Sequence, residues 1–229
     1  MRLDHLAIVQ DDFALRADWS AEPGGRVAVI GPSGAGKSTL LHTIAGFLPP
    51  SEGAVLWQGA RIDALPPGQR PLSILFQDQN LFPHLTIAQN LGLGLDPALR
   101  RVDWRAVEAV LERVGLSGLG ARRPAQLSGG QQSRAALARA LLRQRPLLLL
   151  DEPFAALGPA LKAEMLDLVD ALAGDALVLM VTHDPADARR FARDTVLVAE
   201  GVAAPPVPTA ALFADPPPAL AAYLGGAAF

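Results

Sequence analysis

Residues Gly31–Ser38 restrict the fold of this chain more than any other segment, because they fit the spacing G-x-x-x-x-G-K-S/T. They directly follow the apolar run Val27–Ile30 and precede Thr39–Gly46, whose composition predicts a helix closed by glycine. Gly34 and Gly36 permit backbone angles that residues with a Cβ avoid, so successive N–H groups can point at an anion. The order strand, glycine loop, helix therefore predicts a phosphate cradle within an α/β fold.

Lys37 and Ser38 supply the charge and the hydroxyl that a bound triphosphate needs. Lys37 brings an ammonium group to the outer phosphates, and Ser38 offers a hydroxyl to Mg²⁺. The chain has two lysines, Lys37 and Lys162, and arginine fills the other basic positions, so composition alone does not explain a lysine here. A glycine-rich turn with a stray lysine is the alternative, and the flanking strand and helix argue against it. We expect the chain to bind a nucleoside triphosphate.

Length and composition narrow the class of protein. A chain of 229 residues can form one large α/β domain with a small inserted subdomain. The net charge of −3 and the lack of a basic stripe argue against a nucleic-acid partner. The lack of cysteine excludes disulfides and thiolate metal sites. Met1–Asp12 lacks the hydrophobic region of a signal peptide, and apolar runs such as Ala176–Val181 are far shorter than the ~20 residues of a spanning helix. We expect a protein that does not cross a membrane by itself but can sit against one.

Apolar runs and turn residues predict the order of the elements. We expect short strands within residues 1–30, and further strands at 54–57, 72–76, 147–150 and 177–181. Helices are expected between about residues 78 and 140. Asp103 should cap one of them, and its apolar stripe is assigned to the core: Trp104, Val107, Val110, Leu111 and Val114. A second helix should run from Gly129 to Arg143, with alanines that allow close packing.

The C-terminal segment, residues 205–229, is rich in proline and alanine, and Pro216–Pro218 interrupts any long helix. Two short helical turns are expected, near residues 209–214 and 218–224. A docking segment is one interpretation of this tail, and a loosely packed end is the one we favour.

Two carboxylates, Asp151 and Glu152, follow the apolar run Leu147–Leu150. At the end of a sheet strand, one carboxylate can hold Mg²⁺ and the next can polarise an attacking water. Neighbouring residues of a strand point to opposite sides, which separates these two tasks. An ordinary exit from strand to turn is the alternative, and the phosphate loop upstream favours the catalytic interpretation.

A second anion-binding surface is predicted at Leu127–Gln131. Its serine and two glycines open the alanine-rich helix, where unpaired N–H donors lie at the positive end of the helix dipole. One triphosphate needs only one cradle. A second surface of this kind suggests that two copies of the chain share their nucleotides.

These segments, in this order, resemble those of ABC-type ATPases, whose signature motif is similar to Leu127–Gln131. The resemblance extends from about residue 1 to residue 204. It implies an α/β fold of the P-loop NTPase type, with a RecA-like core, an antiparallel β portion and an inserted helical subdomain. Residues 1–229 would then be a single ABC ATPase domain, with a nucleotide-binding core at 1–77 and 141–204, the helical subdomain with the signature at 78–140, and a short C-terminal tail at 205–229.

The resemblance implies ATP and Mg²⁺ as ligands and assigns a role to each motif. The nucleotide-binding residues would be Gly31, Pro32, Ser33, Gly34, Ala35, Gly36, Lys37, Ser38 and Thr39 of the Walker A loop, and Ser128, Gly129, Gly130 and Gln131 of a second copy. The metal ligands would be Ser38, Gln77 and Asp151. The catalytic residues would be Glu152, the switch histidine His183 and the Q-loop glutamine Gln77.

The four histidines are interpreted differently. His183 follows the apolar run Leu177–Val181, where a strand end could present it to phosphate. An isolated histidine there would more often belong to the core or to a helix entry, which is our interpretation of His5, His42 and His84. The complete set of motifs favours the functional interpretation for His183.

Two positions depart from the family pattern. The loop after the catalytic glutamate usually has an aspartate where this chain has Gly158. Gly158 cannot make the side-chain contacts expected across the dimer, so coupling of the two ATP sites is in question and a non-hydrolysing module is an alternative. Glu152 and His183 argue against that alternative. The residue that stacks on adenine is also open between Phe13 and Gln10.

A finer resemblance, to the ATPase subunits of bacterial thiamine importers, rests on Gly31–Leu41, Ile44–Leu48 and Pro66–Leu95. It implies uptake of thiamine or its phosphates, driven by ATP from the cytoplasmic face of the inner membrane. Membrane-spanning permease subunits would bind near Gln77–His84, and a periplasmic substrate-binding protein would act through them. Import of another small solute and an export ATPase are alternatives. DNA-repair relatives carry a long coiled-coil insertion and translation-type relatives carry two cassettes, so neither class fits.

Overall fold

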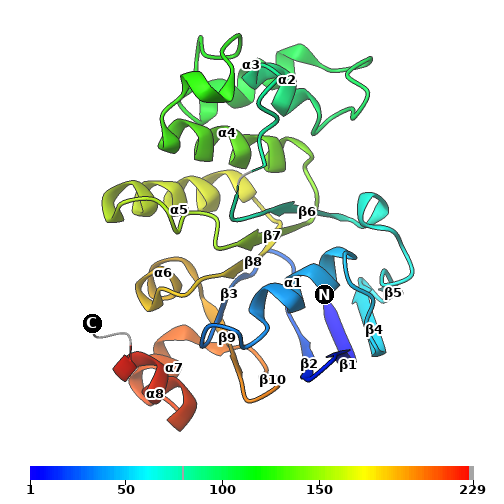
Figure 1. The fold of residues 1–229 in the computed structure, drawn as a ribbon, viewed down its shortest axis with the longest axis vertical. Coiled ribbons are helices and arrows are strands. Elements are labelled where there is room, and N and C mark those ends of the chain that lie inside the picture. The colour runs from blue at the N-terminus through cyan, green and yellow to red at the C-terminus, as the bar shows by residue number, and fades with distance from the viewer. Residues whose placement is uncertain (79, 227–229) are drawn as a thin grey trace.

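The computed structural model describes residues 1–78 and 80–226, and Figure 1 shows how their elements are arranged. The strands are β1 (Arg2–Gln10), β2 (Phe13–Ser20), β3 (Arg26–Ile30), β4 (Glu52–Trp57), β5 (Ala60–Arg61), β6 (Leu72–Leu75), β7 (Leu147–Asp151), β8 (Leu177–Val181), β9 (Asp194–Ala199), β10 (Val202–Ala203) and β11 (Val207–Pro208). The α-helices are α1 (Lys37–Ala45), α2 (Ile87–Gly92), α3 (Trp104–Arg113), α4 (Gly129–Leu142), α5 (Pro159–Ala173), α6 (Pro185–Phe191), α7 (Thr209–Ala214) and α8 (Pro218–Gly226). Two short 3-10 helices, η1 (Pro67–Gln69) and η2 (Pro124–Gln126), lie in connecting segments.

The described strands form one continuous sheet in the order β5-β4-β1-β2-β10-β9-β3-β8-β7-β6, with β11 paired to β9. One half is antiparallel, because β1 pairs with both β2 and β4 in that direction. The other half is parallel and contains β9, β3, β8, β7 and β6. Its strands β7 and β8 are buried along their whole length, as expected for parallel strands covered on both faces.

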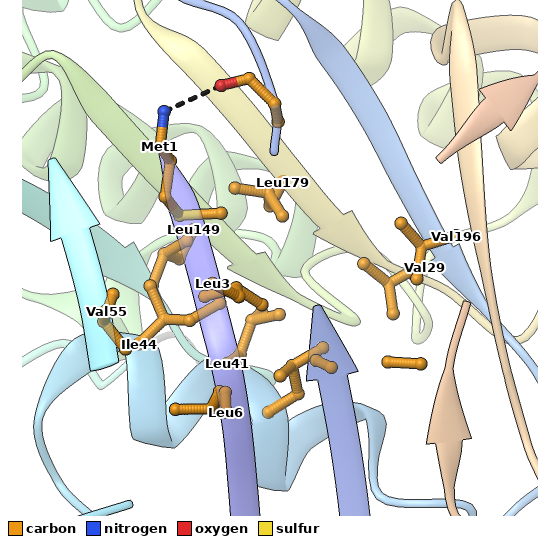
Figure 2. Close-up of a cluster of buried hydrophobic side chains, with 14 of the residues drawn as sticks. Met1, Leu3, Leu6, Val29, Leu41, Ile44, Val55, Leu149, Leu179 and Val196 are labelled. Carbon is orange, nitrogen blue, oxygen red and sulfur yellow. Dashed lines mark hydrogen bonds between the residues drawn. The ribbon is translucent and has the colours of Figure 1, made fainter. Parts of the chain in front are cut away.

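Successive residues of β7 and β8 face two different cores, because side chains alternate along a strand. Leu149 and Leu179 pack on α1, together with residues of β1 and β4 such as Leu3 and Val55. Figure 2 shows Leu41 and Ile44 of α1 within this cluster. Leu148, Leu150, Val178 and Met180 point the other way and pack on α4 and α5. Helix α1 is therefore enclosed between the two halves of the sheet.

Helices α2, α3 and α4 form a separate cluster at one end of the molecule (Figure 1). Val107, Leu111 and Val114 of the predicted stripe are buried there, and the predicted N-cap Asp103 accepts hydrogen bonds from two N–H groups of α3. The assignment of Trp104 to the core is wrong, since this residue is 47% exposed. Trp104 is the first residue of α3, before the helix turns its apolar face inward, and only the edge of its ring lies beside Gly92.

The C-terminal tail forms the two short helices that the sequence predicts, but the expectation of a loosely packed end is wrong. Leu212 of α7 and Leu220 of α8 are buried against Ile30 of β3 and Ala188 of α6. Thr195 of β9 and Thr209 form a buried hydrogen bond between their hydroxyls of 2.8 Å. A few leucine and threonine side chains thus fix a segment whose proline and alanine content suggested little packing. Among the described residues, none of the helices has both the length and the apolar character that crossing a bilayer requires.

Arg70 is buried at the C-terminal end of α1 and donates hydrogen bonds to carbonyl groups there. Its guanidinium donates to the carbonyls of Thr43 and Ile44 at 2.8 and 2.7 Å, and to those of Asp63 and Leu65 at 2.9 Å. The Thr43 carbonyl also accepts from the Gly46 N–H at 3.2 Å, and the Ile44 carbonyl lies in the last turn, where a helix leaves carbonyls without a partner. Arg70 therefore joins α1 to the segment that follows β5.

We predict that Arg70→Ala lowers the free energy of unfolding by about 3 kcal/mol, because it leaves several buried carbonyls without donors. Arg70→Lys should recover little, since an ammonium cannot reproduce the planar fork. Denaturant unfolding of the purified protein measures both. Arg105→Ala is the control, because Arg105 is exposed on α3, and it should cause a much smaller loss. Equal losses for the two arginines would contradict this role of Arg70.

Candidate functional site

The loop between β3 and α1 requires glycine at two positions, where other parts of the chain lie close to its backbone. At Gly31 a Cβ would lie 2.0 Å from the carbonyl oxygen of Val198, and the φ angle is 149°. At Gly36 a Cβ would lie 2.4 Å from the ring of Phe13, and the φ angle is 99°. Neither position accepts a side chain without movement of a neighbour. The loop is thus held against β9 on one side and β2 on the other.

Lys37 lies inside this loop and is almost fully buried. Its Nζ donates to the carbonyl oxygens of Gly31 and Pro32, both at 2.9 Å. Burial lowers the pKa of Lys37, and the carboxylates of Glu152 and Asp151 act in the opposite direction. An ammonium has three N–H groups, so one remains for a phosphate oxygen while the other two hold the loop.

Ser38 and Asp151 bring two hard oxygen ligands together. The Ser38 hydroxyl donates to Asp151 Oδ1 at 2.8 Å, which links the start of α1 to the end of β7. The second oxygen of Asp151 lies 3.4 Å from Nε2 of His42. Burial raises the pKa of Asp151, whereas the hydrogen bond from Ser38 and the charge of His42 oppose this rise. Hydroxyl and carboxylate oxygens are ligands that Mg²⁺ accepts, so these residues fit a divalent cation.

Glu152 leaves the strand in a different conformation from Asp151. Its φ angle is 46°, in the left-handed region that is uncommon for residues other than glycine, and its N–H bonds to the carbonyl of Val181 at 3.0 Å. Its Oε2 lies 3.0 Å from Nδ1 of His183, which follows β8. The turned backbone sends Glu152 to His183 while Asp151 faces Ser38, so the two acids have different partners. Strained residues of this kind are concentrated at functional sites.

A cavity of about 590 Å³ opens over these groups. Its lining residues come from the phosphate loop and the start of α1, from the ends of β1, β2, β7 and β8, and from the tail: Gln10, Phe13, Ser33, Gly34, Gly36, Lys37, Ser38, Thr39, Glu152, His183 and Tyr223. One hollow therefore contains the lysine, the loop N–H donors, a carboxylate and an imidazole. That set can bind a polyphosphate and activate a water molecule beside it.

The remaining predicted site residues lie outside this lining. Gly31 and Pro32 supply carbonyls to Lys37, and Ala35 lies within the loop. Gln77 follows β6, is exposed and is not among the residues that line the cavity. Gln79, which falls inside the predicted permease-binding range 77–84, lies outside the described residues.

The second predicted anion-binding segment starts α4. The Ser128 hydroxyl accepts from the Gln131 N–H at 3.3 Å, and the Gln131 side chain accepts from the Ser128 N–H at 2.9 Å. This capping box leaves the N–H groups of Gly129 and Gly130 in the first turn, where a helix offers donors to an anion. Ser128, Gly129, Gly130 and Gln131 do not line the cavity of their own chain.

Several residues of the site were not recognised in the sequence. His42 was assigned to ordinary structure, yet it lies beside Asp151; its position four residues after Ser38, on the same face of α1, is the signal that could have found it. Tyr223 lines the cavity from α8, and no local pattern predicts that placement. Phe13 and Gln10 both line the cavity, so the choice of an adenine-stacking residue between them stays open.

Comparison with known proteins identifies the family. The family model described as ABC transporter matches residues 15–155, more than half of the chain. The chain belongs to the ABC transporter family. This membership confirms the predicted fold class and the prediction that the chain binds nucleotide.

Individual relatives cover nearly the whole chain. It is 68% identical to the thiamine import ATP-binding protein ThiQ of Cereibacter sphaeroides, over 98% of this chain and 99% of that protein. It is 59% identical to the protein of the same name from Ruegeria sp. (strain TM1040), with the same coverage. Among solved structures, it is similar to the dimeric post-hydrolysis state of the ATP-binding cassette MJ0796 bound to ADP and Pi, with a TM-score of 0.77 and 28% identity over 91% of this chain and 98% of that one.

We predict that Lys37→Ala weakens binding of a nonhydrolysable ATP analogue by at least about tenfold, because the charge that faces the outer phosphates is lost. Isothermal titration calorimetry of the purified protein measures the affinity. The control is Arg113→Ala, which removes an exposed cation at the end of α3, outside the cavity lining, and should leave the affinity close to that of the original chain. Unchanged binding by Lys37→Ala would remove Lys37 from the site.

Proposed function

We propose that this chain is the ATP-hydrolysing subunit of a bacterial ABC importer that takes up thiamine or thiamine phosphates across the inner membrane. The observation that carries the ATPase activity is the single cavity that contains Lys37, Glu152 and His183. The cargo is supported by the two relatives, at 68% and 59% identity over nearly the whole chain, that are named thiamine import ATP-binding proteins.

The residues of the cavity divide the chemistry of ATP hydrolysis among them. The loop N–H groups and Lys37 bind the phosphates, and catalysis rests on positioning and charge stabilisation. Ser38 and Asp151 would hold Mg²⁺, with Gln77 as a further ligand, and the ion would supply positive charge that offsets the charge of the phosphates. Glu152 orients the attacking water and accepts its proton. His183, bonded to Glu152, keeps the carboxylate in place and faces the outer phosphate.

A second copy of the chain completes each ATP site. The N–H donors of Gly129 and Gly130 lie outside the cavity of their own chain, so they act on the nucleotide of a partner copy. Dimeric structures of a similar cassette, at 27% and 28% identity, support this arrangement. Within this single ABC ATPase domain, the helices of residues 78–140 thus carry the surface that reads the partner's ATP, and the core carries the hydrolytic residues.

Permease subunits dock at a groove between β6, α4 and the segment that follows α2. This groove has a volume of about 400 Å³ and is lined by Ser73, Ile74, Phe76, Asn80, Phe82, Leu93, Gly94, Pro97, Arg139, Ala140 and Arg143. Phe82 is 46% exposed and gives this groove an apolar side chain that a partner can cover. Peripheral attachment at the cytoplasmic face of the inner membrane follows from this docking, and a periplasmic substrate-binding protein acts through the permease.

A chain of aromatic contacts joins the groove to the ATP site. Phe76 lines the groove and makes an edge-to-face contact with His42, with ring centroids 5.9 Å apart, and His42 lies beside Asp151. Phe47, another exposed aromatic residue, lies 5.5 Å from Phe76. The packed rings connect the docking surface to the metal-binding carboxylate. A shift of the permease against the groove can therefore move Asp151 through these contacts.

The experiment that tests the function uses Glu152→Gln. This variant keeps the cavity and the phosphate contacts, so it should bind ATP as the original chain does while its turnover falls by at least about a hundredfold. Purified protein provides the ATPase rate. Cells that lack their own thiamine-import ATPase, supplied with this chain and its permease, provide the uptake of labelled thiamine.

The original chain should restore thiamine uptake, and Glu152→Gln should not. Full turnover by Glu152→Gln would exclude this residue as the base. ATP hydrolysis without thiamine uptake, but with uptake of another solute or with export, would retain the ATPase and reject the cargo.

We predict that Phe82→Ser abolishes thiamine uptake while the ATPase rate of the isolated protein changes less than about twofold, because the change removes apolar contact area from the groove alone. Trp104→Ser is the matched control, since Trp104 is equally exposed but lies outside the groove. Both variants are measured in the same uptake assay. Loss of uptake by both, or by neither, would contradict docking at this groove.

A further inference from the structure

Helix α8 brings a side chain from the end of the chain into the ATP cavity. Tyr223 lines the cavity together with Ser33, Gly34, Glu152 and His183. Its hydroxyl donates a hydrogen bond to the main-chain carbonyl of His183, although the two residues lie forty positions apart in the sequence. The family model ends at residue 155, so this contact lies outside the segment that defines the family.

The position of Tyr223 is fixed by the residue one turn before it. Leu220 is fully buried and packs with Ile30 of β3 and Ala188 of α6. Residues three apart lie on the same side of a helix, so the buried face of α8 also carries Tyr223. Strand β3 leads into the phosphate loop and α6 follows His183, which places α8 against both elements that flank the cavity.

The ring of His183 depends on its backbone for its position. Its side chain is 57% exposed, so packing does not hold it, and its one described contact is the 3.0 Å approach to Glu152. The backbone is held on two sides. Tyr223 binds the carbonyl of His183, and Lys162 pairs at 2.9 Å with the side chain of the next residue, Asp184.

We propose that Tyr223 is a positioning residue for ATP hydrolysis: its hydroxyl holds the backbone of His183 so that the imidazole stays against the carboxylate of Glu152. The inference rests on the proposed ATPase function and extends it to the tail. Burial raises the pKa of Tyr223, and the carboxylates of Asp184 and Glu152 raise it further, so the phenol remains a hydrogen-bond donor at neutral pH.

The test is Tyr223→Phe, which retains the ring and removes only the hydroxyl. We expect kcat for ATP hydrolysis to fall about fivefold, the effect of one lost hydrogen bond, with KM for ATP unchanged. Hydrogen–deuterium exchange of the nucleotide-free protein should become faster in peptides that cover residues 182–188, because loss of the bond to the His183 carbonyl lets this backbone segment open more often. The thermal unfolding midpoint should stay within about two degrees of the original value.

Ala222→Ser, on the exposed side of the same helix, is the control and should change neither kcat nor exchange. An unchanged kcat in Tyr223→Phe overturns the proposal. So does a change in KM alone, which would make Tyr223 a nucleotide contact. A rise in exchange spread over the whole protein also overturns it, because the effect would then be general destabilisation.

Failure of the ATPase proposal gives a different result. In that case the original chain shows no turnover, or Glu152→Gln remains fully active, whatever the exchange at residues 182–188 reports about Tyr223.

Discussion

The alignment of β3, β7 and β8 as buried parallel neighbours is the constraint on which the rest of the structure depends. Their register pairs Val29 with Val181, and Asp151 with the same Val181, so all three strands end at one edge. Each strand has a different group at that edge: β3 leads into the glycine loop, β7 ends at the two carboxylates, and β8 is followed by the histidine. Because the strands are apolar on both faces, sliding one of them would move a whole row of leucines and valines out of two cores at once. The position of the proposed catalytic groups is therefore a consequence of core packing.

Helix α1 holds residues of the candidate site in place, because side-chain contacts fix both of its ends. At its start, Lys37 and Ser38 face the phosphate loop and Asp151. At its end, Arg70 binds the last carbonyls. Between them, Leu41 and Ile44 pack between the two halves of the sheet (Figure 2). A short helix with two fixed ends cannot shift along its axis without losing contacts at both. The hydroxyl of Ser38 stays within hydrogen-bond distance of Asp151 for the same reason.

The sequence predicts what depends on local spacing, and fails where packing between distant segments decides. Gly31–Ser38 and the apolar runs of β7 and β8 were sufficient to predict the loop, the strands and the meeting of Lys37 with Glu152. Asp103 was identified as an N-cap because capping depends on the residues directly after it. Trp104, by contrast, fits the periodicity of α3 but is exposed, since the surface that covers a helix face cannot be seen in the helix itself. His42 and Tyr223 were missed because their partners, Asp151 and His183, come from strand ends more than thirty residues away.

Gly158 shows how a departure from the family pattern can be understood from its surroundings. Its φ and ψ angles, −66° and 158°, are accessible to any residue, and a Cβ there would meet nothing within 4 Å. Neither strain nor crowding therefore demands glycine at the start of α5. The glycine leaves the N-cap of α5 without a side chain. Helix α5 still contacts the segment after His183, through another of its residues. Lys162, one turn further along α5, pairs at 2.9 Å with Asp184, the N-cap of α6, and at 3.3 Å with Asp187 in its first turn. Helix α5 thus remains tied to the residues after His183 by ion pairs within the same chain.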